Sequence, residues 1–305
     1  MITPKPLHKG ARIALVAPAS CMKEEGQDKE DKLKQCIDVL KNMGLEAILF
    51  PTCWTNYGYL AGSDQERADD IMNAFADPDI DGIFCLRGGY GVQRMLKLLD
   101  FHQIKQNPKW FAGYSDITAL HTMLNQACEM VTYHAPMPST EMIADDFDAY
   151  TKEYLEKAMF GQLVGELPSK KPCETMHGGK AAGLLCGGNL SLVSSSLGTP
   201  YEIDTKGKIL FLEDVGESPY RIDGMINHMR LAGKFDDCAG IIMGYYTDCE
   251  PENASMTLHQ IFQDLLPQDK PVLLGYTCGH SRPTMTLPLG AQAILDADAQ
   301  TLTIQ

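Results

Sequence analysis

The sequence predicts an α/β protein of two domains, because short apolar runs alternate with amphipathic stretches from its first residues onward. Apolar runs without polar alternation, such as 80–86, are expected where helices cover both faces of a parallel sheet. A length of 305 residues allows two ordinary domains. We expect an N-terminal, doubly wound, mostly parallel sheet with helices on both faces over residues 1–160. A linker over 161–179 and a C-terminal mixed α/β domain over 180–305 follow.

Strands and helices alternate along the predicted first domain. The stretch 29–43 places its apolar residues on one helical face and stops at Gly44. Ser63 and Glu66 form a capping box that opens a second helix, and a third helix is expected through Met95, Leu96 and Leu99. Buried strands are predicted at 11–17, 45–50, 80–86, 109–112 and 130–134.

The stretch 161–179 is rich in Gly, Pro and Lys, which is typical of a surface connector. Beyond it, helices are predicted from Asn189 to Leu197 and over 219–231. The C-terminal stretch 286–305 is expected to form an antiparallel hairpin that turns near 296–299. The strands predicted for this domain are 181–186, 208–215, 239–243 and 271–276.

The composition narrows the class of partner and the compartment. With 26 Lys and Arg against 40 Asp and Glu, the net charge is −14, which argues against nucleic acid or an anionic membrane as a partner. The ten cysteines are scattered without a C-x-x-C pair, as expected of buried thiols in a reducing compartment, and no His/Cys spacing suits a metal. The first apolar run is too short for a signal peptide and is broken by Pro18, so we expect a cytoplasmic protein.

The segment 111–121 contains a candidate nucleophile. Gly113 stands two residues before Ser115 on a predicted strand-to-helix turn, which is half of a nucleophile elbow, although the second Gly of the full pattern is missing. Such a turn exposes the hydroxyl and leaves the next backbone N–H able to meet developing negative charge. The alternative is that Ser115 only caps the helix that follows it.

A nucleophilic serine needs a histidine base and an acid that orients this base. His121 lies one helical turn after Ser115 among apolar residues, which suggests packing. His134 ends the next strand and could approach the same rim. His280 is favoured over His134, because it follows a glycine on a loop just past a buried run.

The acid is expected near the end of the strand 208–215. If Leu210 and Leu212 face the core, alternation directs Glu213 to the opposite face. The carboxylates of Glu213 and Asp214 could instead be a charge pair suited to the N-terminus of the following helix.

Seven short motifs stand in order along the chain: Arg87-Gly88-Gly89-Tyr90-Gly91, Gly113-Tyr114-Ser115-Asp116, Gly187-Gly188-Asn189-Leu190, Leu212-Glu213-Asp214-Val215-Gly216-Glu217, Tyr220-Arg221-Ile222-Asp223, Gly279-His280 and Pro288-Leu289-Gly290. Taken together, these motifs resemble the LD-carboxypeptidase family of serine peptidases, which also contains the microcin C self-immunity peptidases. The resemblance extends from residue 11 to the C-terminus.

The resemblance implies an N-terminal doubly wound domain, a C-terminal mixed α/β domain and a Ser–Glu–His triad. Matched residue by residue, Ser115 is the nucleophile, His280 the general base and Glu213 the orienting acid. Glu217 is set aside, because the family's catalytic Glu immediately precedes Asp in this strand. The order Ser…Glu…His is one of several that such triads adopt.

The resemblance also implies an oxyanion hole made by the backbone N–H groups of Gly89 and Asp116, with no metal and no nucleotide cofactor. The family's usual substrate is the murein tetrapeptide, a muropeptide that loses its terminal D-Ala, and similar proteins are usually homodimers. Arg87 is our candidate for the substrate carboxylate, since a guanidinium pairs with a carboxylate bidentately. Other candidates for substrate contacts are Gly88, Tyr90 and Asn189, with Arg94 and Arg282 as alternatives to Arg87.

The sequence is also compatible with three other functions. Within the family, the substrate could be microcin C or a related aminoacyl-nucleotide, although the run 220–223 looks like the murein-recycling branch. A glutamine-amidotransferase-like hydrolase would need a Cys where Ser115 stands. A non-catalytic binder of cell-wall fragments would not need the Ser, Glu and His.

Overall fold

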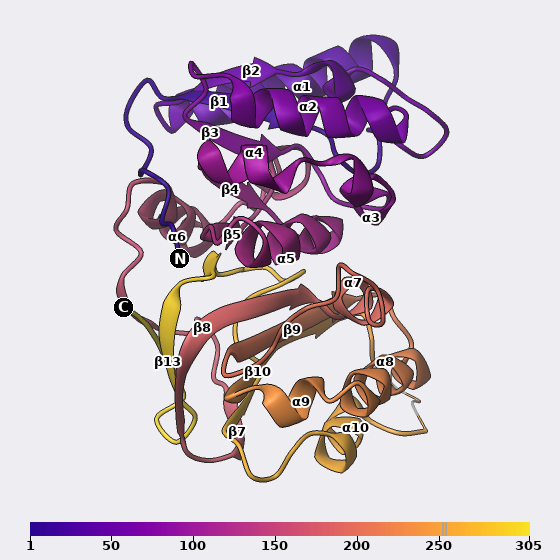
Figure 1. Ribbon diagram of the computed structural model, residues 1–305, viewed down its shortest axis with the longest axis vertical. Coiled ribbons are helices and arrows are strands. Elements are labelled where there is room, and N and C mark those ends of the chain that lie inside the picture. Colours follow the sequence, from indigo (N-terminus) through magenta and orange to yellow (C-terminus); the bar gives the residue numbers. More distant parts are fainter. Residues whose placement is uncertain (252, 254) are drawn as a thin grey trace. The chain divides into compact units, whose positions relative to one another are not determined.

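The computed structural model describes residues 1–251, 253 and 255–305 (Figure 1). By its internal contacts the chain divides into two compact units. Unit 1 comprises Met1–Leu163 with Thr286–Pro288, and unit 2 comprises Val164–Met285 with Leu289–Gln305. Each unit is built on its own sheet, so the predicted α/β class is confirmed.

Unit 1 contains a six-stranded sheet in the order β12-β5-β4-β3-β1-β2. The pairs β1–β2, β1–β3, β3–β4 and β4–β5 are all parallel, as predicted. The order reverses between β1 and β3, and ligands of such sheets bind outside the carboxyl ends of the strands at this switch point. The strands are β1 (Arg12–Val16), β2 (Glu46–Leu49), β3 (Gly82–Cys85), β4 (Trp110–Gly113), β5 (Thr132–His134) and β12 (Leu287–Leu289).

The helices of unit 1 follow local sequence signals closely. The capping box predicted at Ser63 and Glu66 is present and opens α2. The predicted helix through Leu99 is wrong: Leu99 is extended, and the Asp100 side chain caps a new helix by accepting from the Gln103 N–H. The helices are α1 (Gly26–Asn42), η1 (Pro51–Cys53), α2 (Asp64–Ala76), α3 (Val92–Met95), η2 (Leu96–Leu98), α4 (Phe101–Gln106), η3 (Ser115–Ile117), α5 (Thr118–Gln126), η4 (Pro138–Met142) and α6 (Ala149–Met159).

Unit 2 contains an eight-stranded mixed sheet in the order β6-β14-β13-β8-β9-β10-β11-β7. The run from β8 to β11 is parallel, and the flanking pairs are antiparallel. Leu210 and Leu212 join the core cluster that α8 and α10 complete with Ile222, Ile226 and Ile261. The elements are β6 (Gly165–Leu167), β7 (Glu174–His177), β8 (Lys180–Asn189), α7 (Leu190–Ser195), β9 (Ile209–Val215), α8 (Pro219–Leu231), α9 (Lys234–Asp237), β10 (Gly240–Thr247), α10 (Leu258–Leu265), β11 (Val272–Leu274), β13 (Gln292–Asp296) and β14 (Thr301–Ile304).

Two expectations about chain organisation need correction. The stretch 161–179, expected to be a linker, contains β6 and β7, which form the two edges of the unit 2 sheet. These strands are short, and Leu167 is the one buried residue in them, so they lack the apolar pattern that reveals a buried strand. The hairpin of β13 and β14 is confirmed, but the preceding β12 pairs into the sheet of unit 1 instead.

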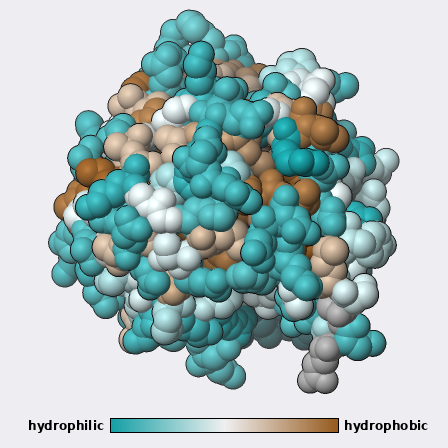
Figure 2. Space-filling view, turned by 90° about the horizontal axis from the view of Figure 1, so that it is seen from below, coloured by the Kyte–Doolittle hydropathy of each residue, from teal (hydrophilic) through white to brown (hydrophobic). Residues whose placement is uncertain are grey.

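The structure shows the state of the cysteines and the character of one face of the surface. All ten cysteines are free, with eight buried and two half-buried, and burial raises the pKa of the Cys36, Cys128 and Cys186 thiols to about 12. The face shown in Figure 2 is mainly hydrophilic with separate apolar patches. Over the described residues, no helix has the length and apolarity to cross a bilayer, and no three potential ligands gather to hold a metal ion.

Candidate active site

Ser115 has the backbone of a nucleophile elbow. It follows β4 and begins η3 with φ at 65°, in the left-handed region that residues other than glycine rarely adopt. The residue that caps η3 is Tyr114, and neither η3 nor α5 receives a side-chain cap. The alternative that Ser115 is only an N-cap is therefore wrong. A left-handed turn at this place is the backbone conformation that a nucleophile elbow requires, and the nucleophilic role of Ser115 stays a prediction.

The glycine-rich loop after β3 lies directly against this turn. A Cβ on Gly88 would stand 2.8 Å from Ser115 Cβ and 3.0 Å from its Oγ. Gly89 has φ at 117°, and a Cβ there would stand 2.4 Å from Ser20 Oγ. Ser20 Oγ also accepts a hydrogen bond from the Tyr90 N–H at 3.1 Å. Ser20 follows β1 and Gly89 follows β3, so the loop occupies the switch point of the sheet.

The Asp116 side chain links the turn at Ser115 to this loop. Its side chain is almost fully buried, and Oδ2 accepts from the Val92 N–H at 2.8 Å. Burial raises the pKa of the Asp116 carboxyl to about 6, although the Val92 N–H and the charge of Arg67 both act to lower it. Arg67 is itself fully buried and donates to the carbonyl oxygens of Pro18 and Gly91.

Two of the candidate bases are buried in unit 1. His121 Nε2 lies 2.8 Å from the Gly113 carbonyl oxygen, and its Nδ1 lies 2.8 Å from Thr132 Oγ1. Burial lowers the pKa of His121 to about 3, so this ring stays neutral and packs as predicted. His134 is 2% exposed, and its ring meets the Tyr114 ring edge-on at 5.4 Å.

His280 is held by a buried carboxylate within unit 2. Its Nδ1 lies 2.7 Å from Glu213 Oε2, and its backbone N–H donates to the same oxygen at 3.0 Å. Among the described histidines, His8 and His259 also lie near carboxylates, but both side chains are at least half exposed. The His280 side chain is 16% exposed and that of Glu213 is 0% exposed. This pair has the arrangement of a general base and its orienting acid.

Two family profiles match the chain. The LD-carboxypeptidase N-terminal domain matches residues 13–135, and the LD-carboxypeptidase C-terminal domain matches residues 182–295. A relative from Bacillus subtilis (strain 168), named "Probable murein peptide carboxypeptidase", is 39% identical over 310 residues, which cover 99% of this chain and 94% of that protein. The chain belongs to the LD-carboxypeptidase family.

Relatives of this LD-carboxypeptidase include both branches considered above. The crystal structure of a muramoyltetrapeptide carboxypeptidase from Oxalobacter formigenes superimposes with a TM-score of 0.83 at 27% identity, covering 96% of this chain and 98% of that one. The microcin C7 self-immunity protein MccF from Escherichia coli is 27% identical over 275 residues, which cover 81% of this chain and 80% of that protein.

Asn189, at the end of β8, contacts the two carboxylates near the end of β9. Its Nδ2 donates to Asp214 Oδ1 at 3.0 Å and to Glu213 Oε1 at 3.4 Å, while its Oδ1 caps α7. Asp214 also accepts from the Ser191 N–H and hydroxyl, and burial raises the pKa of its carboxyl. These hydrogen bonds of Asn189 hold the two carboxylates, and its predicted contact with substrate stays a prediction. Glu217 forms a separate ion pair with Arg221.

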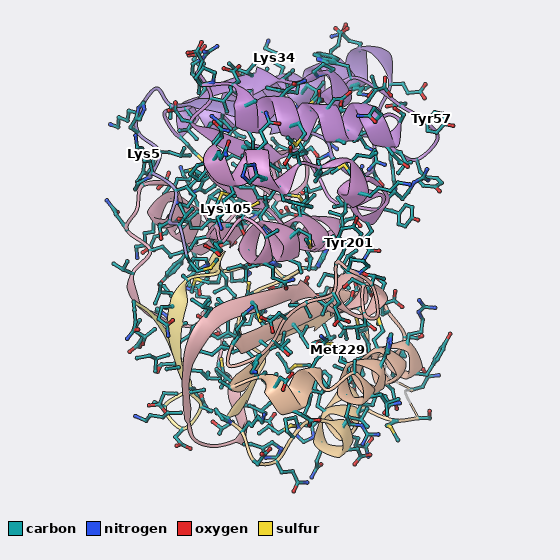
Figure 3. All side chains as sticks on the ribbon, in the orientation of Figure 1. Lys5, Lys34, Tyr57, Lys105, Tyr201 and Met229 are labelled. Carbon is teal, nitrogen blue, oxygen red and sulfur yellow. The ribbon has the colours of Figure 1, made fainter. Side chains whose placement is uncertain are left out.

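The other substrate candidates lie near the glycine-rich loop. Arg87 is half-buried and donates from Nη1 to the Cys21 carbonyl oxygen at 3.0 Å. Tyr90 is 51% exposed, and its ring meets that of Tyr59 at 5.8 Å. Tyr59 lies in a turn that begins at Tyr57, which is labelled in Figure 3. The Tyr57 N–H donates to the Leu60 carbonyl oxygen across this turn.

Sequence reasoning missed two residues that position this loop. Ser20 lies in a short segment after β1, where nothing local marks a contact 70 positions away. Arg67 stands three residues after Asp64, which is typical of an exposed ion pair along a helix. A signal was present in the register of α2, because Arg67 falls on the face that also buries Ile71 and Ala74.

Proposed function

We propose that this chain is a serine carboxypeptidase that cleaves the bond between an L-centre and a terminal D-amino acid. Its substrate is the murein tetrapeptide, from which it releases D-Ala during cytoplasmic recycling of the cell wall. The observation that carries the proposal is the buried Glu213, which accepts from both the ring and the backbone N–H of His280. Names of relatives in both comparisons support the same substrate class.

The proposed mechanism uses side chains and backbone groups of this protein together with a water molecule. His280 Nε2 removes the proton from Ser115 Oγ as this oxygen attacks the carbonyl carbon, and Glu213 stabilises the imidazolium through Nδ1. The backbone N–H groups of Gly89 and Asp116 bind the oxyanion, and one such donor is worth about 3–4 kcal/mol. The imidazolium then protonates the leaving amine of D-Ala. A water molecule, deprotonated by His280, hydrolyses the acyl-serine and regenerates the hydroxyl.

The substrate's free carboxylate is assigned to Arg87. Its position two residues before Gly89 supports this role, because a guanidinium here can pair with a group next to the scissile bond. Of the alternatives, Arg94 already forms an ion pair with Asp64. Arg282 stays an alternative candidate for binding the substrate carboxylate.

The test is release of D-Ala from a defined tetrapeptide, followed by mass spectrometry. Wild type is expected to release D-Ala and to react with a serine-directed fluorophosphonate probe. Ser115→Ala is expected to lose both, whereas Ser195→Ala on α7 keeps both. In the same assay, Arg87→Ala is expected to raise KM. Labelling of Ser115→Ala at the wild-type rate would exclude Ser115 as the nucleophile, and an unchanged KM would exclude Arg87.

A second candidate activity is hydrolysis of microcin C-type aminoacyl-nucleotides, which the match to the MccF protein favours. Side-by-side turnover of tetrapeptide and of processed microcin separates the two. Labelling by the fluorophosphonate without turnover of either would point to another acyl substrate. A protein that binds muropeptide but shows neither labelling nor turnover would be a non-catalytic binder.

Two further parts of the proposal concern the setting of the enzyme. The ten free thiols support a reducing compartment such as the cytoplasm. A homodimer is proposed from the resemblance to the family, and the molar mass measured by light scattering tests it. A mass near the 33.6 kDa of one chain would contradict the dimer.

A further inference from the structure

One peptide group in the glycine-rich loop forms hydrogen bonds with two buried charged side chains, one at its carbonyl oxygen and one at its N–H. The carbonyl oxygen of Gly91 accepts from Arg67 Nη1 at 2.8 Å. The N–H of Val92 donates to Asp116 Oδ2 at 2.8 Å. This oxygen and this N–H belong to the same amide, so a guanidinium meets its negative end and a carboxylate meets its positive end. Both interactions are charge-assisted hydrogen bonds.

The charged groups that hold this peptide are buried, and their burial costs free energy. Arg67 is 0% exposed, Asp116 is 1% exposed and Val92 is 0% exposed. A buried charge needs close partners to offset its lost hydration. Asp64 also pairs with the Arg67 guanidinium, and Arg94 pairs with Asp64 in turn. The charges that face this peptide are therefore balanced within one network.

The same two side chains reach both segments that carry the assigned oxyanion donors. Asp116 directly follows Ser115, and its own N–H is one of these donors. Gly89, the other donor, stands two residues before the clamped amide. Arg67 Nη1 also donates to the Pro18 oxygen at 2.6 Å, in the segment whose Ser20 Oγ accepts from the loop.

The loop comes as close to the guanidinium as the backbone permits. Gly91 has φ at 125°, and a Cβ there would stand 2.9 Å from Arg67 Nη1. A larger residue would push the amide away from the guanidinium. This close approach indicates that the loop is seated on Arg67 and does not merely pass near it.

We propose that Arg67 and Asp116 clamp the Gly91–Val92 peptide group and thereby set the spacing between the Gly89 and Asp116 N–H donors. The inference rests on the proposed function for the role of these donors. In it, the Asp116 side chain and Arg67 are positioning residues that act through the loop. Neither side chain needs to contact the substrate.

The experiment compares Asp116→Asn with Asp70→Asn. Asp70 is a second buried carboxylate, on α2, and it accepts from one backbone N–H, that of Thr52, at 2.7 Å. Asp116→Asn is expected to lower kcat for D-Ala release at least tenfold with KM within twofold of wild type, because a displaced donor weakens transition-state binding. Asp70→Asn is expected to lose thermal stability but to keep kcat.

Hydrogen exchange separates a failure of the clamp from a failure of the proposed function. Asp116→Asn and Arg67→Met are expected to speed exchange of peptides covering 87–95, whereas Asp70→Asn leaves these peptides protected. Arg67→Lys keeps the charge but loses the fork, so intermediate exchange is expected, and this variant serves if Asp116→Asn does not fold. Unchanged exchange over 87–95 in the folded variants would overturn the clamp, whatever the substrate. If exchange rises while wild type releases no D-Ala, the proposed function fails and the clamp stands.

Discussion

Steric room around Ser115 is set by one neighbouring residue. Gly88 has no Cβ, and a methyl group there would fall within contact distance of both Ser115 Cβ and Oγ. The backbone of Gly88 does not have a positive φ, so its requirement is for space and not for conformational freedom. Ser115 itself holds φ at 65°, so little freedom remains for it to move aside.

Gly88→Ala therefore tests whether Ser115 must keep its present position. We expect kcat/KM for D-Ala release to fall about 10–100-fold, because a displacement approaching 1 Å at the reacting atom has this order of effect. Gly224→Ala on α8 is the matched control, since a Cβ there meets nothing within 4 Å. An active Gly88→Ala enzyme with wild-type kcat/KM would show that Ser115 tolerates the shift.

At the scale of elements, the elbow is braced by one histidine. His121 on α5 reaches back to the Gly113 oxygen at the end of β4 and across to Thr132 at the start of β5. With the Gly113 oxygen as acceptor, Nε2 carries the proton and Nδ1 accepts from the Thr132 hydroxyl. The His121 ring is 0% exposed, and burial of a charge there is costly, so the folded state favours the neutral form.

This requirement gives acid sensitivity with a definite sign. The pKa of His121 falls from 6.5 in the unfolded chain to about 3 in the folded one. Its contribution to stability is complete above pH 6.5 and is lost as the pH falls from 6.5 toward 3. Between pH 7 and 4.5 we expect this group alone to lower the free energy of unfolding by about 2.5 kcal/mol.

Urea unfolding of His121→Gln at both pH values measures this contribution. The variant is expected to start less stable at pH 7 and to lose about 2.5 kcal/mol less than wild type on acidification. His102→Gln removes an exposed histidine of the same unit and is expected to follow wild type. Equal losses in wild type and His121→Gln would show that His121 does not titrate in this way.

Elements with local signals could be predicted from the sequence, and those that depend on distant partners could not. The Ser63 capping box and the stop at Gly44 are short-range features, and α2 and α1 begin and end beside them. The split of the helix before Leu99 depends on the Asp100 cap, a local signal that the apolar pattern obscured. β6 and β7 exist only through their pairing with β14 and β11, which no local pattern encodes.

The candidate site divides in the same way. Alternation correctly separated Glu213 from the core face of Leu210 and Leu212, and burial of His121 agrees with its apolar neighbours. The contacts of Ser20 and Arg67 with the loop join segments 24 to 70 residues apart, so they needed the fold. The pairing of Glu213 with His280 spans 67 residues; loop placement and strand alternation made both residues candidates, and the family resemblance chose them over the alternatives.

At the scale of the whole molecule, the two units are not continuous in sequence, because each contains two separate segments of the chain. The segment Thr286–Pro288 belongs to unit 1, although the chain on both sides of it belongs to unit 2. Its strand β12 is the neighbour of β5 and closes one edge of the six-stranded sheet. Leu287 is fully buried there. β12 is itself the edge strand of this sheet, and its length of 3 residues is typical of edges that resist unwanted pairing.

Leu287→Ala is expected to destabilise the protein by about 2–5 kcal/mol, as for other fully buried leucines. The loss of hydrogen-exchange protection should appear in β5 of unit 1, which is 153 or more positions away in sequence. Leu295→Ala in β13 is the matched control, and its loss should appear in β8 and β14. Deprotection confined to β13 and β14 in Leu287→Ala would contradict the assignment of β12.

The single carboxylate oxygen that accepts from both the ring and the main chain of His280 has a consequence for discrimination among substrates. The torsions of this imidazole are fixed as unit 2 folds, so good and poor substrates would meet the same orientation of the base. On the proposed mechanism, selectivity for the departing D-amino acid then has to arise from groups other than Glu213 and His280. Engineering a new specificity would begin with side chains around the glycine-rich loop, and the acid–base pair could be left untouched.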